Sequence, residues 1–510
     1  MSHDAPDSLS LDTYPSVPLV VASQARRAVE DFVRTTFPTD AEPWFETTWD
    51  EFLGKSNQLF RGPFYSLKLP FKPGEKQGDF FPDVPTSFPP YLHQERAFER
   101  LASEPPLSTL IATGAGSGKT ESYMIPILDW RRRDRTRRGI KAIIVYPMNA
   151  LANDQAKRFA KTIYDNPNLR GLRVGLFVGG LDELKATALM SEDSVVTSRE
   201  AQRETPPDIL LTNYKMLDYM LTRPKDYPIW RFNEPGVLRY VVVDELHTFD
   251  GAQGVDLACL LRRVLARAKT SKKDVCFVGS SATLGDGADE KKRTLDFASC
   301  LFGKTFDSDA LIGEQTLEPG DLIGNRLTVW GRDVEAADAI ACGWAFCDGK
   351  VDYLRKQVEL WFGDDFALSE EPDEEERVEL GEQLLTLAFF QNLIKTLAGN
   401  TLDVDELARA MKRSIVRFDW KNAEAVAALF DGAFALLGFA RRRVVKSDGT
   451  VQIAPFLNVR VHWEILKEYG FAARIGRTLE KSNCSIPTLR PEIRDAWADK
   501  AELRVSRNRR

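Results

Sequence analysis

The sequence lacks the features of a membrane-spanning or exported protein. It has no run of about 18 apolar residues, so no transmembrane helix is expected. The opening residues, MSHDAPDSLS, are polar and acidic, and they lack the basic and apolar stretches of a signal peptide. We therefore expect a cytoplasmic protein with no membrane partner.

Paired cysteines and clustered histidines are also missing. The 6 cysteines are scattered and none forms a CxxC pair, so neither a zinc site nor a disulfide framework is predicted. We expect them to be buried thiols in a reducing compartment. Of the 4 histidines, His247 has no second histidine near it in the sequence, which argues against a role as a metal ligand.

The chain also lacks an excess of positive charge and internal repeats. Its formal net charge of −6 gives no support for nucleic-acid binding by the molecule as a whole. Such binding needs only a local basic or polar track, so it is not excluded. A length of 510 residues predicts roughly two to four domains.

The part of the chain from about 107 to 284 alternates short apolar runs with helical patterns, and the domain that contains it is expected to span 86–288. This alternation predicts an α/β fold with a mostly parallel sheet and helices on both faces. Ligands of such sheets bind at the carboxyl ends of the strands. The predicted strands are 107–112, 142–146, 172–178, 208–212, 240–244 and 275–280.

The flanking regions have a different texture. Residues 1–85 are expected to form an N-terminal accessory region, with a helix over 22–37 and irregular structure over 43–90. Residues 289–510 are expected to form a largely α-helical region. Its predicted parts are an acidic loop at 369–377, a buried helix over 378–397, helices over 404–413 and 423–441, a β-rich piece over 451–462 and a disordered tail.

A glycine-rich loop follows the first predicted strand. The sequence ATGAGSGKT brings small residues between a strand and a helix, where backbone N–H groups and the helix N-terminus bind phosphates. Lys119 would reach the β- and γ-phosphates of ATP, and the Thr120 hydroxyl would bind Mg²⁺. The strict pattern asks for glycine where this chain has Thr113. The predicted ATP-binding residues of the loop are Thr113, Gly114, Ala115, Gly116, Ser117, Gly118, Lys119 and Thr120.

Two further motifs follow later strands. VVVDELH delivers two carboxylates at a strand end. Asp244 would hold Mg²⁺ through water, and Glu245 would orient and deprotonate the attacking water. SSATL, over 280–284, is a weak motif alone, and its value comes from its position after the other two.

Together these motifs resemble those of superfamily 2 DEAD/DEAH-box-type helicases, in particular Lhr-like and mitomycin-repair-type DNA helicases. Five elements match in order between about 89 and 285: TGAGSGKT, YPMNALANDQ, TNYKMLDYML, DELH and SAT. The resemblance implies that this part is a RecA-like P-loop domain. It also implies that Gln94, in PPYLHQERAF, reads the adenine edge, although a plain helix-surface glutamine is the alternative.

The resemblance implies two more groups of residues. His247, Ser281 and Thr283 would couple the state of the nucleotide to the grip on nucleic acid. Backbone-directed contacts to DNA would come from Asn149, Gly179, Gly180, Thr212 and Asn213, for which turn or capping roles are the alternative. The basic run 131–139 suits either a DNA patch or a solvated helix end.

Motors of this class place ATP between two RecA-like domains, and the residues after 286 do not match the motifs of the second. We therefore expect the ATP-binding half of a truncated or split helicase or translocase, completed by a second RecA-like domain on another chain. The alternative is an ATP-responsive DNA-binding subunit with little turnover. An arginine finger contributes about three to five orders of magnitude to turnover in related NTPases, so the isolated chain should hydrolyse ATP poorly.

Overall fold

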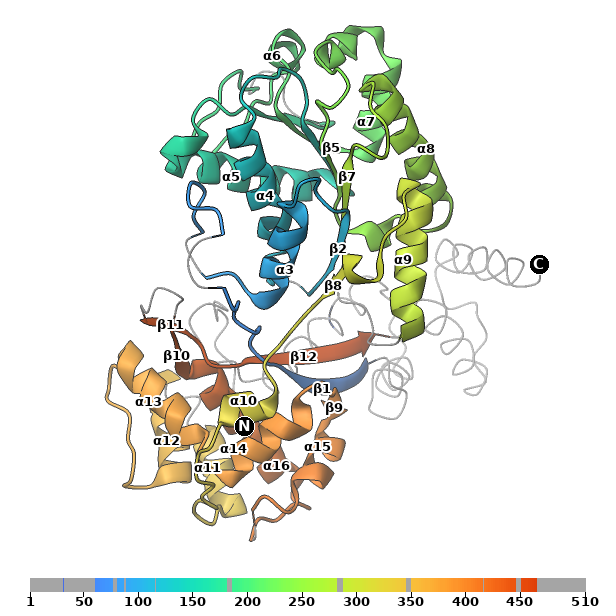
Figure 1. The fold of residues 1–510 in the computed structure, drawn as a ribbon. Coiled ribbons are helices and arrows are strands. Elements are labelled where there is room, and N and C mark those ends of the chain that lie inside the picture. The colour runs from blue at the N-terminus through green and yellow to red at the C-terminus, as the bar shows by residue number, and fades with distance from the viewer. Residues whose placement is uncertain are drawn as a thin grey trace, which may run out of the picture. The chain divides into compact units, whose positions relative to one another are not determined.

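The chain folds into two compact units. The described residues of one unit form a single stretch of sequence, and those of the other come from separate stretches. The computed structural model describes residues 31, 60–76, 80–86, 89–114, 116–180, 186–281, 288–344, 350–415, 417–445 and 451–465. Phe71–Thr316 form the unit called here the sheet unit, and the described residues of 60–70, 317–445 and 451–465 form the helical unit (Figure 1). The expected helix over 22–37, apart from Asp31, and the expected disordered tail lie outside the described residues.

The sheet unit is built on a parallel seven-stranded sheet, as the alternating sequence pattern predicts. The strand order is β4-β5-β3-β6-β7-β2-β8, and every neighbouring pair is parallel. Each of the six predicted strands is confirmed, and β8 is an addition that is too short to give a sequence pattern. The strands are β2 (Thr109–Ala112), β3 (Ala142–Tyr146), β4 (Val174–Phe177), β5 (Ile209–Asn213), β6 (Tyr240–Val243), β7 (Cys276–Ser281) and β8 (Leu311–Gly313).

Helices cover both faces of this sheet because alternate strand residues point in opposite directions. In β3, Ile144 packs with α3 (Leu92–Leu101), α4 (Lys119–Arg133) and α5 (Asn149–Asp165). Its neighbours Ile143 and Val145 pack on the other face with α7 (Tyr214–Thr222), α8 (Gly251–Arg267) and α9 (Ala288–Phe302). Short helices complete the unit: η1 (Pro167–Leu169), α6 (Arg199–Glu204), η3 (Pro224–Trp230), η4 (Leu246–Thr248) and η5 (Ser308–Ala310).

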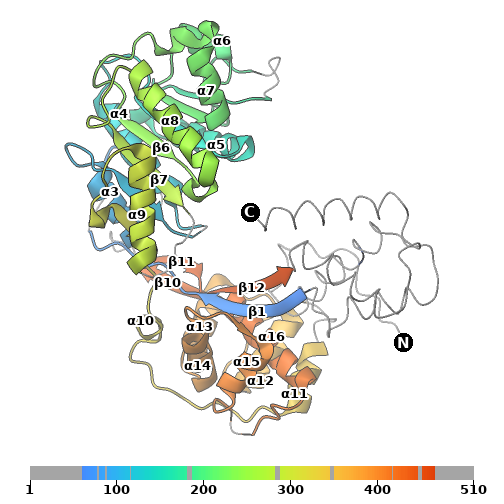
Figure 2. The same cartoon turned by 90° about the vertical axis from the view of Figure 1, so that its right-hand side faces the viewer.

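Segments from both sides of the sheet unit build the helical unit. β1 (Phe60–Lys68) pairs antiparallel with β12 (Asn458–Ile465) (Figure 2) and, at its other edge, with β9 (Leu402–Asp403). The other elements are α10 (Pro319–Ile323), α11 (Ala336–Trp344), α12 (Lys350–Phe362), α13 (Glu374–Leu384), α14 (Ala388–Leu397), α15 (Val404–Met411), α16 (Ala423–Phe439), β10 (Arg441–Val445) and β11 (Val451–Pro455). The units therefore differ from the three consecutive ranges expected from the sequence, because long-range strand pairing joins the two flanks.

Three expectations for the flanks are corrected by the structure. The stretch 43–90, expected to be irregular, contains the strand β1. Part of the acidic segment 369–377 begins α13, because Asp373 and Glu376 each accept a hydrogen bond from the other's backbone N–H and cap the helix. The helix expected over 378–397 is two helices. It breaks where Thr386 and Ala388 pair with the backbone of Val329, at 2.8 Å on each side.

The cysteines also differ from expectation. Cys276 is buried, but Cys259 and Cys300 are exposed and Cys342 is half-buried. Cys259 and Cys300 lie on the outward faces of α8 and α9, whose apolar stripes face the sheet. These four are free thiols. None of the described helices has the length and apolar character needed to cross a membrane.

The side chain of a buried asparagine, Asn233, pairs with the backbone of Ile140 ahead of β3, and its removal should destabilise the fold. Asn233 is fully buried, accepts a hydrogen bond from Ile140 N at 3.2 Å and donates to Ile140 O at 2.8 Å. Because Asn233→Ala leaves both backbone groups unpaired, we expect a loss of about 2 to 4 kcal/mol in the free energy of unfolding, measured by urea denaturation. Asn168→Ala, which removes an exposed contact to Asp83 O, is the control and should cost less than about 1 kcal/mol. Equal losses in the two variants would contradict this interpretation.

Candidate active site

The glycine-rich loop lies between the end of β2 at Ala112 and the start of α4 at Lys119. Gly116 and Gly118 have φ values of +75° and +76°, a region that favours glycine. A Cβ atom at Gly118 would lie 2.3 Å from Gln94 Nε2, so a side chain there would displace Gln94 from its hydrogen bond to Gly118 O. Thr113, the departure from the strict pattern, is buried and shares a hydrogen bond of 2.7 Å with the Ser117 hydroxyl across the loop. Ala115 lies outside the described residues.

Lys119 and Glu245 form an ion pair across the strand ends. Lys119 Nζ lies 3.2 Å from Glu245 Oε1 and donates to Ser281 O at 3.3 Å. Glu245 adopts a left-handed backbone with φ of +49°, which is unusual for a residue other than glycine and occurs preferentially at functional sites. Glu245 follows Asp244 in the sequence, and its side chain reaches Lys119 at the end of the glycine-rich loop.

Asp244 is buried at the carboxyl end of β6. Burial raises the pKa of its carboxyl group above the usual value, against the hydrogen bond that the Ser280 hydroxyl donates to Asp244 Oδ1. Ser280 Oγ also accepts a hydrogen bond from Glu245 N at 3.2 Å. Ser280 therefore holds both acidic residues. The motifs do not predict this role.

These side chains meet at one cavity of ≈ 370 Å³. Lys119, Thr120, Asp244 and Glu245 line it together, as the motifs predict. The motifs do not predict the other side of the cavity, where Arg158 of α5 pairs with Glu121 of α4 at 2.5 Å. No local pattern indicates this pair, because its residues lie 37 positions apart on two helices and only the tertiary packing brings them together. The full lining is Tyr91, Gly116, Ser117, Gly118, Lys119, Thr120, Glu121, Leu151, Gln155, Arg158, Asp244 and Glu245.

Gln94 lies beside this cavity but does not line it. Its side chain is buried, donates to Gly118 O at 3.2 Å and accepts from Tyr91 N at 2.9 Å. The alternative of a helix-surface glutamine is therefore wrong. The structure assigns Gln94 a place against the phosphate-binding loop, and the reading of an adenine edge stays a prediction.

The expected coupling residues meet at the end of β7. His247 Nδ1 lies 3.4 Å from Ser281 Oγ and 3.4 Å from Glu245 Oε2. Lys119 contacts the backbone of the same Ser281. His247 and Ser281 thus touch the two residues of the ion pair, while Thr283 lies outside the described residues.

The residues predicted to contact nucleic acid gather at the carboxyl ends of β3, β4 and β5. Asn149 Nδ2 donates to Gly179 O at 2.9 Å, and Asn213 Nδ2 donates to Asn149 Oδ1 at 2.6 Å. Asn213 Oδ1 also accepts from Met216 N and caps α7. Gly180 has φ of +75°, a turn conformation that favours glycine. The turn role given as its alternative therefore holds, and the turn lies at this face.

Two side chains modify this predicted face. Thr212 is fully buried and donates to Phe177 O at 2.7 Å, so it supports the face from below. Arg199, which the sequence analysis missed, lies over the Phe177 ring and donates to Val178 O at 3.1 Å, next to the Gly179–Gly180 turn. It adds a cation to a surface formed mainly of amides.

The basic run 131–139 is engaged within the protein. Arg131 pairs with Asp208 at 2.8 Å, Arg132 with Asp83 at 2.6 Å and Arg133 with Asp129 at 3.0 Å. Arg137 pairs with Asp134, and Arg135 donates to Asn168 O. Since acidic partners offset much of this charge, the run fits a helix end held to its surroundings better than a DNA patch.

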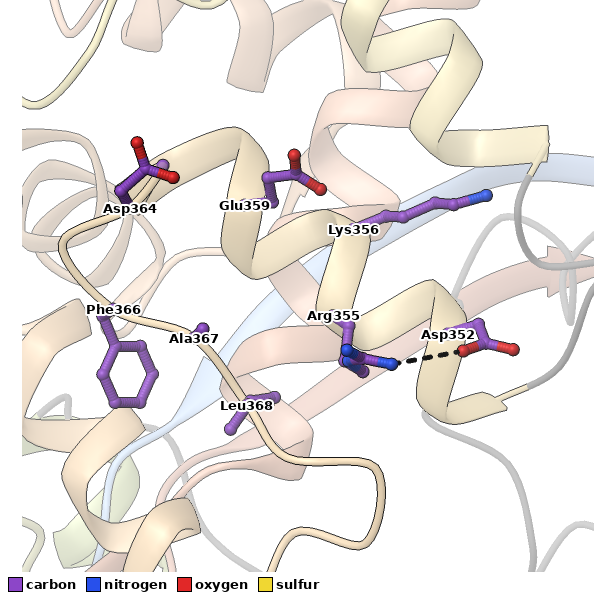
Figure 3. Close-up of a pocket in the computed structure, with 9 residues that line it drawn as sticks. Asp352, Arg355, Lys356, Glu359, Asp364, Phe366, Ala367 and Leu368 are labelled. Atoms are coloured by element: carbon purple, nitrogen blue, oxygen red, sulfur yellow. Dashed lines mark ion pairs between the residues drawn. The ribbon is translucent and has the colours of Figure 1, made fainter.

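A second cavity, of ≈ 490 Å³, lies in the helical unit. α12 and the segment after it supply side chains of both charges to this cavity, and Arg355 is 3.9 Å from Asp352 (Figure 3). It contains none of the motif residues. Among the described residues, no group of three or more histidine, cysteine and acidic side chains is arranged to hold a metal ion.

The parallel sheet and the loop with its two strand-end carboxylates define a P-loop nucleoside triphosphatase domain of the RecA-like class. Residues 91–290 match the family model of the DEAD/DEAH box helicase, so this part of the chain is a DEAD/DEAH box helicase domain. The resemblance noted from the motifs is confirmed.

Three relatives each match less than half of this chain. The Druantia protein DruE of Escherichia coli (strain UMEA 4076-1) is 27% identical over 303 residues, covering 41% of this chain and 16% of DruE. The ATP-dependent helicases MJ1574 and Lhr-Core of Methanocaldococcus jannaschii are 26% and 28% identical over 42% and 35% of this chain, and 28% and 20% of their own lengths. The chain thus spans less than a third of each of these relatives. A solved structure of the DUF1998 helicase MrfA bound to DNA is 15% identical with a TM-score of 0.38, covering 85% of this chain and 69% of MrfA.

Burial of Asp244 should destabilise the ligand-free protein. Because burial raises the pKa of this carboxyl above its usual 3.8, the ionised form costs stability at neutral pH. Asp244→Asn keeps an oxygen that accepts from Ser280 and removes the charge, so its free energy of unfolding at pH 7 should equal or exceed that of the wild type. The difference should shrink as the pH falls through the raised pKa towards 3.8, because the wild-type carboxyl then becomes neutral. Lower stability of Asp244→Asn across this range, measured by denaturant titration, would contradict this account.

Proposed function

We propose that this chain is the ATP-binding half of an ATP-dependent DNA helicase or translocase. The observation that supports this proposal is the cavity where Lys119, Thr120, Asp244 and Glu245 meet at the same sheet edge as Asn149 and Asn213. ATP binding belongs to residues 86–288 of the sheet unit, and the flanks have accessory roles. DNA rather than RNA follows the resemblance to Lhr-like and mitomycin-repair-type DNA helicases.

Within this proposal, each residue of the cavity has a chemical role. The backbone N–H groups of 116–120 and the N-terminus of α4 bind the phosphates, and Lys119 leaves Glu245 to reach the β- and γ-phosphates. Glu245, released from Lys119, then orients the attacking water and accepts its proton. Arg158 offers a further cation on the opposite wall, where it can leave Glu121 for the nucleotide.

The donor set at Asp244 fits Mg²⁺. The carboxylate of Asp244 and the hydroxyl of Thr120 both line the cavity, and hard oxygen ligands are the ones that Mg²⁺ prefers. When bound there, Mg²⁺ would supply positive charge that stabilises the charge developing on the phosphates. Thr120 would bind it directly and Asp244 through water.

Nucleic acid would lie across the face formed by Asn149, Gly179, Gly180 and Asn213. Amide and backbone groups of this kind contact the phosphodiester backbone and give little sequence preference. His247, Ser281 and Thr283 would report the state of the nucleotide to this face. The described wall of the ATP cavity comes from the sheet unit alone, so we propose that a second RecA-like domain on another chain completes the site with arginine fingers. The free thiols suit a cytoplasmic location.

Steady-state ATP hydrolysis tests this proposal directly. We expect Lys119→Ala to abolish ATP binding because the cation for the β- and γ-phosphates is lost, and Glu245→Gln to bind ATP but lose turnover by at least about a hundredfold. Turnover is measured alone and with single-stranded DNA, duplex DNA and RNA. Lys161→Ala, at an exposed position of α5, is the matched control.

The outcomes separate a chain that turns over ATP itself from one that binds ATP but does not hydrolyse it. DNA-stimulated turnover that Glu245→Gln removes supports a motor. Tight ATP binding without turnover in the wild type supports an ATP-responsive DNA-binding subunit or a half-motor that needs its second domain. Unchanged ATP affinity in Lys119→Ala would refute the assignment of the cavity.

The amide face generates a separate expectation for DNA binding. Asn213→Ser keeps an oxygen to cap α7 but is too short to reach Asn149, and Asn149→Ala removes the same link from the other side. Each variant should weaken single-stranded DNA binding roughly threefold to tenfold, the effect of about one hydrogen bond, while basal ATP hydrolysis stays unchanged. Fluorescence anisotropy at fixed salt measures the affinity. Wild-type affinity in both variants would place the DNA elsewhere.

A further inference from the structure

Two short segments that lie next to each other border the phosphate-binding loop without belonging to any helicase motif. Phe71 bridges Thr316 in antiparallel pairing, and Lys72 N donates to Gln315 O at 2.9 Å. Both segments belong to the sheet unit and are the points where the chain enters and leaves it. The segment 314–316 contacts the loop through Glu314, and the segment 71–73 pairs with 91–92, next to His93, which makes the other contact.

Glu314 makes the first of these contacts. Its carboxylate accepts a hydrogen bond from Gly114 N at 2.7 Å. The sheet register produces this approach, because Ala112 of β2 pairs with Gly313 of β8 and the two chains leave their strands together. Glu314 and Gly114 do not line the ATP cavity, so the carboxylate holds the loop from outside and does not occupy the phosphate position.

His93 makes the second contact, at the other end of the loop. Its Nε2 donates to Ser117 O at 2.8 Å, and its side chain is fully buried. The Phe71 ring lies 5.3 Å from the His93 ring, edge to face, and 4.9 Å from the ring of Tyr91, a residue of the cavity wall. The hydrogen bond between Thr113 and Ser117 then joins the two held ends of the loop.

We propose that Glu314 and His93 are positioning residues that hold the phosphate-binding loop for the nucleotide. This inference rests on the proposed ATP binding. The loop binds phosphates with backbone N–H groups, and these act at full strength only when their directions are fixed before binding. Glu314 fixes the peptide before Gly114, and His93 fixes the carbonyl of Ser117. Neither side chain touches the phosphates. Their contribution is to hold the loop, whose glycines are conformationally permissive, in the binding geometry.

Two substitutions of Glu314 separate its hydrogen bond from its charge. Glu314→Ala removes the acceptor, so we expect the Kd and KM for ATP to rise about tenfold while kcat stays within about twofold. Glu314→Gln keeps an acceptor oxygen and should stay within about twofold of the wild type. Glu99→Gln, at an exposed position of α3, is the matched control. ATP affinity of Glu314→Ala equal to that of the wild type would overturn the proposal.

A second measurement keeps this inference distinct from the proposed function. Hydrogen exchange of the peptide covering 110–120, measured without nucleotide, reports the order of the loop itself. It should be faster in Glu314→Ala and near wild type in Glu314→Gln, with the same thermal midpoint for the sheet unit. If the wild type fails to bind ATP, the proposed function fails, and the exchange result still decides whether Glu314 orders the loop. Unchanged exchange in Glu314→Ala would reject that role.

His93 is tested by the same logic. His93→Phe keeps an aromatic ring against Phe71 and Tyr91 but removes the donor to Ser117 O, whereas His93→Gln keeps a donor. We expect weaker ATP binding and faster exchange of the loop in His93→Phe, and partial recovery of both in His93→Gln. Equal behaviour of the two variants in exchange and affinity would show that His93 acts only by packing, and would overturn its positioning role.

Discussion

The parallel pairing of β6, β7 and β2 is the constraint on which the active site depends. Ala112 lies beside Ser281, and Val243 beside Gly279, so three strands that are far apart in sequence end at one edge. Parallel strands place like ends together, and buried strands confine polar side chains to those ends. The ion pair between Lys119 and Glu245 is a direct consequence of this arrangement.

The same edge contains two clusters of side chains, the cavity and the amide face, which share a scaffold but no residue. The ends of β2, β6 and β7 supply the cavity, while the ends of β3, β4 and β5 supply the amide face. β3 and β6 are neighbours, so the boundary between the two sites lies inside one sheet. His247 and Ser281 contact the ion pair, so a change in the partners of Lys119 acts directly on them.

The helical unit depends on pairing between strands that are far apart in the sequence. Its small sheet pairs β1 with β12, and the whole sheet unit lies between these strands in the sequence. Its core contains Tyr65 of β1 stacked on Phe434 of α16, with ring centroids 5.1 Å apart. Residues before and after the helicase domain therefore fold as one body.

Much of the sheet unit was predictable because its signals are local. Each strand is a short apolar run, and each motif is a few adjacent residues whose chemistry follows from their types. The predictions for Lys119, Asp244 and Glu245 placed them at strand ends, and the structure brings them together. The flanks were predicted less well. The acidic segment proved to be partly a helix cap, and the single helix over 378–397 was divided by pairing with Val329.

By itself, the sequence determined the class of fold, the positions of six strands along the chain and the residues capable of phosphate chemistry. Those properties depend on residue type and on spacing within one element. Only the tertiary structure decided that Ser280 holds both acidic residues, that Arg158 faces the loop, that Glu314 binds Gly114 and that the flanks share a unit. Each of these is a contact between residues distant in sequence, and such contacts are set by packing and strand register, which leave no local pattern.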